Sequence, residues 1–179
     1  MALRTTPLGS LTGTGWPDLL LTSLRALTTS LKGTHMNNPP RQSYLEPTQE
    51  SGRALFSRGS SGPVVMLNLL RFRPIADYSS TPELAPPTAI SGEAAYGLYV
   101  KHTLPHLEKS GGELLFFGRG GQFLIGPTEE RWDAAMLVRQ ASLTQFMAFA
   151  ANQEYMSGIG HRLAALEDSR LLPLTEGFD

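Results

Sequence analysis

Hydrophobic and polar positions alternate with a period of two along residues 62–74, GPVVMLNLLRFRP. This period predicts a β-strand, because successive side chains of a strand point to opposite faces of its sheet. One predicted face holds Val64, Met66, Asn68, Leu70 and Phe72, and the other holds Val65, Leu67, Leu69, Arg71 and Arg73. Apolar residues prevail on both faces. The strand therefore belongs in a core, where Asn68 and Arg71 need polar partners.

A long loop and then a helical period follow this strand. Residues 74–91 contain four prolines, which exclude a continuous helix or strand. A functional lid or arm and a plain surface insertion are both interpretations of this loop. Ser91 begins a predicted helix that Gly111 and Gly112 end. The apolar face of this helix consists of Tyr96, Tyr99, Val100, Thr103, Leu104 and Leu107.

Three strands are predicted after that helix, in residues 113–118, 122–126 and 131–140. The sequence GRGG, residues 118–121, predicts a hairpin turn between the first two of them. A phosphate-binding loop is not predicted there, because such a loop needs a helix after it and the next segment has a strand pattern.

The segment after residue 140 is predicted to hold two helices and a last strand. Ser142 and Gln145 have the spacing of a capping box, which opens a helix. Its predicted inward side chains are Leu143, Phe146, Met147 and Ala150. A further helix is predicted over 159–169 and a last strand over 170–174. The order β–α–β–(β)–β–α–β predicts an α+β fold, the ferredoxin-like split βαβ with an antiparallel sheet. Helices would cover one sheet face, and the apolar second face predicts a homodimer that closes into a dimeric α+β barrel.

The N-terminal residues have a different composition. Residues 1–35 are basic, rich in Ser and Thr and poor in acids, and leucines with a helical period make 17–32 a candidate amphipathic helix. An organellar transit peptide, sequence upstream of a true start at Met36, and an accessory helix are the three interpretations.

Composition excludes several classes of function. The chain of 179 residues is 41% hydrophobic, which suits one domain with extensions. A formal net charge of −1 gives no field that would recruit nucleic acid or an anionic membrane. The absence of cysteine excludes disulfides and thiolate chemistry. No apolar run reaches the roughly 18 residues of a membrane span. We expect a cytoplasmic protein.

Four motifs of the chain resemble the DUF1330 family of uncharacterised proteins. They are GPVVMLNLLRFR, GEAAYGLYVKHTLPHLEKSGGELLFFG, RWDAAMLVRQAS and EYMSGIGHRLAALEDSRLLPL, in this order. The resemblance covers about residues 45–174 and implies a ferredoxin-like protomer, a homodimer and a pocket between sheet and helices. We therefore expect an N-terminal extension over 1–44, poorly ordered or partly helical, and a DUF1330-like domain over 45–179 with its core in 62–174. Related superfamilies include cofactor-free enzymes and plain ligand binders, so the fold does not transfer a chemistry.

His161 and Asp133 are the candidate catalytic residues. Histidine titrates near neutral pH and is the usual proton shuttle, and Asp133 would orient it or act as a base. Arg162, next to His161, would hold a carboxylate or an enolate oxygen. The alternative is structural: Arg162 pairs with an acid such as Glu167, and His161 is a surface residue.

Four further residues are candidates for substrate binding. Asn68 would polarise a carbonyl, and Arg71 would reach an anionic ligand or a rim acid such as Asp133. Trp132 and Tyr99 would form walls of the pocket, although packing in the core, or at an interface for Trp132, is the simpler explanation of both.

Metals and cofactors are not expected. His102 and His106 have a chelating i, i+4 spacing, but no third ligand is evident. The predicted function is the binding of a small organic molecule, acyl or aromatic, with proton-transfer catalysis that uses no metal or nucleotide. A non-catalytic carrier or sensor and a protein-interaction module are the alternatives.

Overall fold

The computed structural model describes residues 42–59 and 62–175. Its centre is a four-stranded antiparallel sheet with the strand order β2-β3-β1-β4. The strands are β1 (Val64–Phe72), β2 (Glu113–Gln122), β3 (Arg131–Gln140) and β4 (Leu166–Thr175). With one helical connection after β1 and another after β3, this is the ferredoxin-like plan, and the predicted fold class is confirmed.

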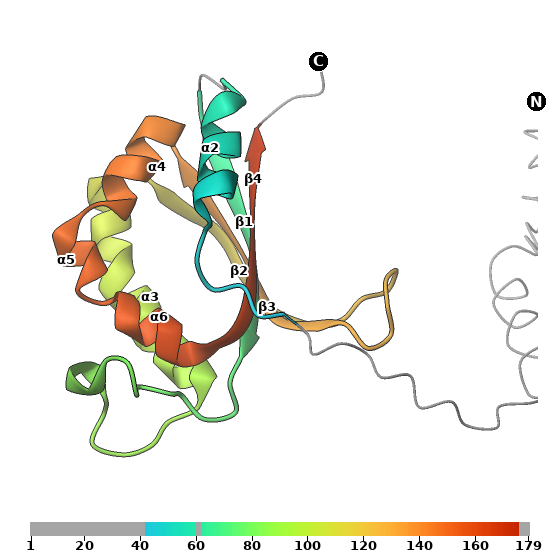
Figure 1. Cartoon of the computed structure of the whole chain (residues 1–179), viewed down its shortest axis with the longest axis vertical. Helices are drawn as coiled ribbons and strands as arrows, with labels where there is room; N and C mark the ends of the chain where they lie inside the picture. Colours follow the sequence, from blue (N-terminus) through green and yellow to red (C-terminus); the bar gives the residue numbers. More distant parts are fainter. Residues whose placement is uncertain (1–41, 60–61, 176–179) are drawn as a thin grey trace, which may run out of the picture. The chain divides into compact units, whose positions relative to one another are not determined.

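The helices lie against one face of the sheet (Figure 1). They are α2 (Gln49–Ser57), α3 (Gly92–Lys109), α4 (Leu143–Ala150), α5 (Gln153–Met156) and α6 (Ile159–Ala165), with a 3₁₀ turn at Pro82–Leu84. Ser91 begins α3 as predicted, because its hydroxyl accepts a hydrogen bond from the amide of Ala94. Gly111 follows the helix with a φ of +76°, a conformation that favours glycine. None of the helices in the described ranges has the length and hydropathy that crossing a bilayer requires.

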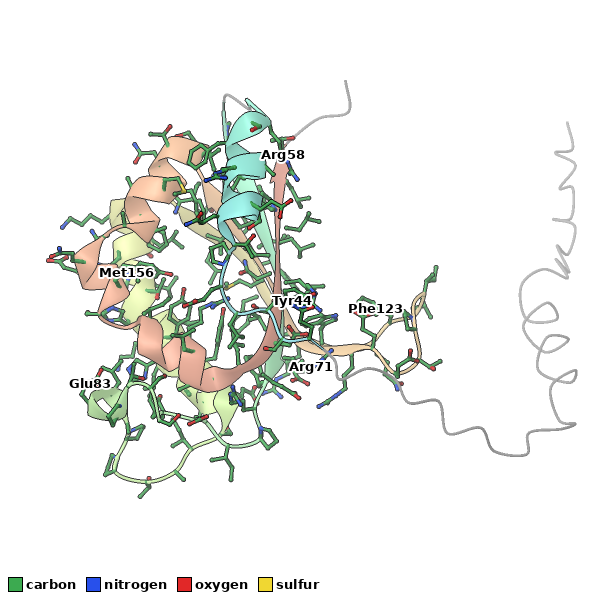
Figure 2. The ribbon with its side chains drawn as sticks, in the orientation of Figure 1. Tyr44, Arg58, Arg71, Glu83, Phe123 and Met156 are labelled. Atoms are coloured by element: carbon green, nitrogen blue, oxygen red, sulfur yellow. The ribbon has the colours of Figure 1, made fainter. Side chains whose placement is uncertain are left out.

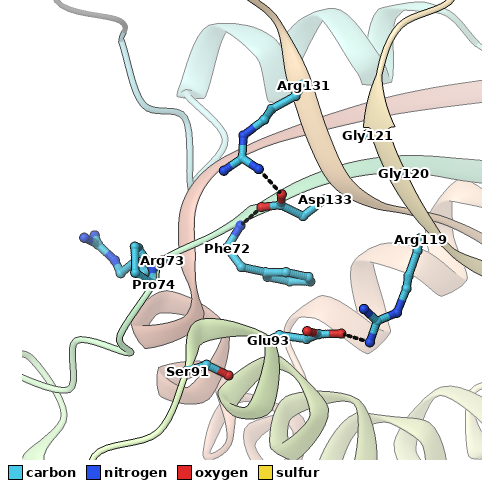
Figure 3. Close-up of a pocket in the computed structure, with 10 residues that line it drawn as sticks. All are labelled: Phe72, Arg73, Pro74, Ser91, Glu93, Arg119, Gly120, Gly121, Arg131 and Asp133. Atoms are coloured by element: carbon cyan, nitrogen blue, oxygen red, sulfur yellow. Dashed lines mark hydrogen bonds and ion pairs between the residues drawn. The ribbon is translucent and has the colours of Figure 1, made fainter.

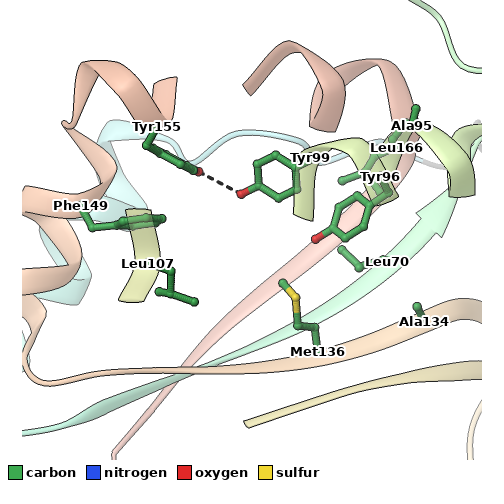
Figure 4. Packing of buried hydrophobic residues seen from close by; sticks show 11 residues of the cluster. Leu70, Ala95, Tyr96, Tyr99, Leu107, Ala134, Met136, Phe149, Tyr155 and Leu166 are labelled. Atoms are coloured by element: carbon green, nitrogen blue, oxygen red, sulfur yellow. Dashed lines mark hydrogen bonds between the residues drawn. The ribbon is translucent and has the colours of Figure 1, made fainter. Parts of the chain in front are cut away.

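The core fills the space between the sheet and the helices (Figure 4). Its buried members are Leu70, Ala95, Tyr96, Tyr99, Leu107, Ala134, Met136, Phe149, Tyr155, Ala165 and Leu166. The rings of Tyr96 and Tyr99 lie 5.3 Å apart and bind α3 to this layer. The residues predicted for the apolar face of α3 thus face the core, as the helical period requires.

The second face of the sheet carries exposed apolar side chains. The strand register places Leu67 beside Leu137 of β3 and Leu172 of β4. Phe116 of β2, opposite Leu137, is 54% exposed. No helix of the described residues covers this face (Figure 1).

The two edge strands are irregular. A β-bulge between Leu114 and Phe116 interrupts the ladder of β2. On the opposite edge, Pro173 of β4 pairs with Met66. Residues 42–45 lie along the start of β4, where the amide of Ser169 donates to the carbonyl of Tyr44.

The predicted hairpin turn at GRGG is wrong. β2 runs through residues 118–121 to Gln122, and the connection to β3 is residues 123–130, so the predicted strand 122–126 falls mostly in the connection. A Cβ on Gly120 would collide with the carbonyl oxygen of Trp132 on β3. The glycine therefore permits a close approach of two strands, which is the other common reason for glycine in a sheet.

Two other boundaries differ from the prediction. α6 ends at Ala165, and β4 already begins at Leu166. Residues 166–169 are strand because they pair with β1 and with the segment 42–45. In α4, Phe149 is buried against the ring of Tyr155, whereas Met147, predicted to point inward, is exposed. The candidate helix 17–32 and most of the predicted extension lie outside the described residues.

Candidate functional site

A depression of about 380 Å³ opens where the sheet meets the start of α3 (Figure 3). The end of β1, the first turn of α3, the glycine-rich end of β2 and the start of β3 form its walls. Its lining residues are Phe72, Arg73, Pro74, Ser91, Glu93, Arg119, Gly120, Gly121, Arg131 and Asp133. The ring of Phe72 is held in place by the ring of Tyr96, 5.4 Å away, and gives the depression an apolar wall.

Asp133 is the predicted catalytic residue that lies in this depression. One carboxylate oxygen accepts a hydrogen bond of 2.8 Å from the amide of Phe72, and the other lies 3.2 Å from a guanidinium nitrogen of Arg131. The regular ladder between β1 and β3 ends at Leu70 and Ala134, so the Asp133 side chain continues the connection where the backbone pairing stops.

Positive charge exceeds negative charge around the depression. Arg119 pairs with Glu93 at 2.6 Å, as Arg131 does with Asp133. Each of these ion pairs uses one nitrogen of a guanidinium that carries five N–H donors. Arg73 on the rim adds a third positive charge and forms no ion pair with a described residue. The first turn of α3 also favours a negative group. The arrangement suits a carboxylate or another small anion.

Asn68 and Tyr99 lie away from the depression. The Asn68 amide nitrogen donates to the backbone carbonyl of Met66 at 3.1 Å, which satisfies it within its own strand. Tyr99 is buried, and its hydroxyl lies 3.0 Å from that of Tyr155. Burial, followed by the neighbouring Tyr99, raises the pKa of Tyr155. Its hydroxyl therefore stays protonated and bonds inside the core.

Arg71 and Trp132 belong to a buried ionic cluster at the same end of the sheet. The Arg71 guanidinium donates twice to the carbonyl of Arg131, at 3.2 and 2.8 Å, and lies over the Trp132 ring. Its ion-pair partner is Asp168, at 3.8 Å, and not Asp133. Arg170 also lies over the Trp132 ring and binds Asp168 at 2.6 Å. Asp168 and Arg170 were not among the predicted site residues: Asp168 falls in the segment predicted as a helix, and Arg170 at the start of the predicted last strand.

Arg162 fastens the segment 42–45 to the domain. Its two terminal nitrogens donate to the carbonyl of Leu45 at 2.7 Å and to the hydroxyl of Ser169 at 3.2 Å. The suggested partner Glu167 instead accepts, through its backbone carbonyl, a hydrogen bond from Ser43. A second depression, of about 430 Å³, lies along this segment between Gln42 and Thr48.

His161 lies under the loop 74–91. Its Nδ1 is 2.8 Å from the hydroxyl of Tyr78, and the two rings meet edge to face. Burial, followed by the charge of His102, lowers the pKa of His161. Its hydrogen-bond partner is thus Tyr78 of the loop, whereas Asp133 binds Phe72 and Arg131, and no contact joins His161 to Asp133. No local pattern in the sequence marked Tyr78 as a partner.

The lowered pKa predicts how His161 affects stability. The unfolded chain, with an ordinary histidine pKa of about 6.5, binds a proton more readily than the folded chain. The neutral imidazole therefore favours folding above pH 6.5, and this contribution is lost as the pH falls through the folded-state pKa. We expect the stability difference between the wild type and His161→Gln to shrink on acidification from pH 7.5 to 5. Urea titrations across this range measure it, and a constant difference would contradict the prediction.

The two histidines of α3 contact α5. Their rings are 5.1 Å apart, the His102 Nε2 lies 2.9 Å from the carbonyl of Glu154, and the His106 Nδ1 lies 3.7 Å from the Glu154 carboxylate. Within residues 42–59 and 62–175, no cluster of three or more His, Asp or Glu side chains could hold a metal ion.

Comparisons with solved structures match this chain to proteins of unknown function. The protein RPA0582, solved as a target of unknown function from Rhodopseudomonas palustris, is 33% identical, with a TM-score of 0.64, over 77% of this chain and 100% of that chain. The structure of methylated RPA0582 has a TM-score of 0.66 over 76% of this chain and 96% of that chain, again at 33% identity. A dimeric protein of unknown function and ferredoxin-like fold from Bacteroides fragilis is 13% identical, with a TM-score of 0.38, over 63% of this chain and 94% of that chain. No protein-family model and no curated protein matches the chain.

Proposed function

We propose that this chain, which belongs to the family of the RPA0582 protein of Rhodopseudomonas palustris, binds a small organic acid in the depression between Phe72 and the start of α3. The observation that carries the proposal is the composition of that depression. An aromatic wall suits the organic part of a ligand, and three arginines against two carboxylates suit its negative group.

Binding without catalysis is the function that the geometry favours. The space between sheet and helices is filled by the core side chains, so the depression at the end of the sheet is the better ligand site. Arg119 and Arg131 would hold the acid group with charge-assisted hydrogen bonds. Phe72 would contact its apolar part, and the backbone of Gly120 and Gly121 would leave room for it.

Proton-transfer catalysis is the second candidate, and two features favour it. Asp133 presents a carboxylate to the depression, and His161 is a largely neutral imidazole bonded to Tyr78 at 2.8 Å. In this candidate Asp133 would be the base and His161 the proton shuttle. The predicted substrate-binding residues Asn68, Arg71, Tyr99, Trp132 and Arg162 do not line the depression and contact other protein groups, so they do not add to this candidate. The separation of His161 from Asp133 makes this candidate weaker than plain binding.

We further propose that two copies pair through the helix-free sheet face to form a dimeric α+β barrel. Leu67, Leu137 and Leu172 form the middle of an apolar surface that water would otherwise cover. The motifs of residues 62–174 support placement of the family within DUF1330. A cytoplasmic location also stays a prediction.

Native mass spectrometry of the full chain, purified gently from its own host, tests ligand and dimer together. We expect a dimer that carries a reproducible small acidic molecule. A monomer would contradict the pairing of the sheet faces, and a dimer without added mass that binds no supplied acid would contradict the ligand site.

A matched pair of variants locates the ligand. Arg131→Gln should weaken binding about tenfold or more, because a hydrogen bond to a charged group contributes about 1.5–3 kcal/mol. Arg139→Gln is the control: Arg139 lies on the same strand and pairs with Glu113 at 2.5 Å, outside the depression. Titration calorimetry with the recovered acid compares the two. Equal losses in both variants would show that general charge, and not this site, attracts the ligand.

A further inference from the structure

The connection between β2 and β3, residues 123–130, and the two strand ends that carry it form an arm, residues 122–131, with an apolar tip. Leu124 and Ile125 at the tip are 99% and 92% exposed, so these two aliphatic side chains contact almost nothing. Phe123 beside them is also exposed (Figure 2). Contiguous exposed apolar side chains on an ordered segment mark an interaction site.

Hydrogen bonds fix the shape of the arm. Its base is the paired Gln122 and Arg131, and the Gln122 side chain donates to the carbonyl of Thr128 at 3.2 Å. The amide of Glu130 donates to the carbonyl of Pro127 at 3.1 Å. The Glu130 carboxylate accepts a hydrogen bond of 3.1 Å from the indole of Trp132. The tip is thus held away from the domain by an ordered stem.

The direction of the arm indicates what covers the tip. The arm leaves the sheet on the side opposite α3–α6, which is the side of the bare apolar face (Figure 1). A second copy packed on that face would lie beside the arm. Glu129 and Glu130 give the arm two acids, and these disfavour an anionic lipid surface as the alternative.

We propose that the arm of each protomer clasps the partner protomer, with Leu124 and Ile125 buried against it. The proposal rests on the homodimer of the proposed function and adds to it a contact outside the sheet. Because a two-fold dimer repeats each contact, it would contain two arms and bury four of these side chains.

Dissociation of the dimer tests the clasp. The double variant Leu124→Ser/Ile125→Ser removes four buried aliphatic side chains from the dimer. It should raise the dimer dissociation constant by about 10,000-fold, since each such side chain contributes about tenfold or more. Ile75→Ser is the matched control, because Ile75 is an exposed aliphatic residue (65%) in the loop 74–91. Sedimentation velocity over a dilution series measures the constants, and the control should leave the constant unchanged.

The outcomes separate the clasp from the dimer itself. A wild type that is monomeric at every concentration would overturn both proposals. A dimer that Leu172→Asp breaks but the arm variant leaves unchanged would overturn the clasp alone. Wild-type binding to phosphatidylcholine vesicles that the arm variant loses, with an unchanged dissociation constant, would also overturn it and assign the tip to lipid.

Cross-linking gives a direct readout. The chain has no cysteine, so Leu124→Cys provides a unique attachment point for a benzophenone maleimide. Mixed dimers of ¹⁴N and ¹⁵N chains distinguish links between protomers from links within one. Links between light and heavy chains support the clasp, and links found only within a chain would overturn it.

Discussion

Replacement of Asp168 by alanine is expected to lower the free energy of unfolding by about 3–5 kcal/mol, because it leaves a buried arginine without its ion-pair partner. Asp168 is 2% exposed. One of its oxygens accepts hydrogen bonds from the amides of Tyr44 and Ser169, at 2.8 and 2.9 Å, and from Arg170 at 2.6 Å. The other lies 3.8 Å from Arg71, which is 5% exposed. The substitution therefore removes three hydrogen bonds. Because the site is buried, water cannot replace the lost partners.

Urea denaturation measures this effect, and the neighbouring Glu167→Ala is the matched control. Glu167 is exposed, so its substitution should change the stability by no more than about 0.5 kcal/mol. Asp168→Asn should fall between the two, since an amide oxygen still accepts hydrogen bonds but carries no charge. Equal stability of Asp168→Ala and Glu167→Ala would show that the cluster contributes nothing.

Two glycines of α3 should respond to alanine in opposite directions. A Cβ on Gly92 would lie 2.5 Å from the carbonyl oxygen of Arg73 and would also collide with that of Ala165. Both obstacles are backbone atoms that cannot move independently, so Gly92→Ala should cost about 3 kcal/mol. Gly97 has no atom near the position of a Cβ. Gly97→Ala should raise stability by about 0.5–1 kcal/mol, the usual difference within a helix.

Thermal and urea unfolding of both variants give the comparison. Because the two substitutions add the same methyl group to the same helix, a difference in sign isolates the close contact from helix propensity. A destabilisation by Gly97→Ala as large as that by Gly92→Ala would contradict this explanation. Gly92 lies between Ser91 and Glu93, which line the depression, so the Gly92 substitution should also displace part of the proposed ligand site.

The elements of the fold were predictable because their signals are local. The period of two in residues 64–72 and the helical period after Ser91 each depend on neighbours in the sequence. The GRGG segment was not predictable, because glycine serves both a turn and a close approach of strands. The carbonyl of Trp132 on the opposite strand decides between these two roles, and the sequence does not show which strand lies opposite.

The candidate site was predictable only in part, for a similar reason. Asp133 was found because an acid at a strand start is visible in the sequence. The partners of Asp133 are the amide of Phe72 on β1 and the guanidinium of Arg131. The sequence does not show that β1 lies beside Asp133, and it does not show which nearby arginine pairs with the carboxylate. The partners of His161 and Tyr99 come from positions 83 and 56 residues away, and no periodicity connects them. Sequence patterns thus identify residues that need partners but do not identify the partners.

The irregular edges of the sheet bear on how copies of this chain can associate. A strand edge with free amides and carbonyls is a template for endless addition of further strands. Pro173 offers no amide on one edge, where residues 42–45 also occupy the start of β4, and a bulge disrupts the other edge. Growth into fibres through these edges is therefore disfavoured. Association through the helix-free face, as proposed above, would end at two copies and would leave a concentrated solution of the protein without a route to amyloid-like polymerisation.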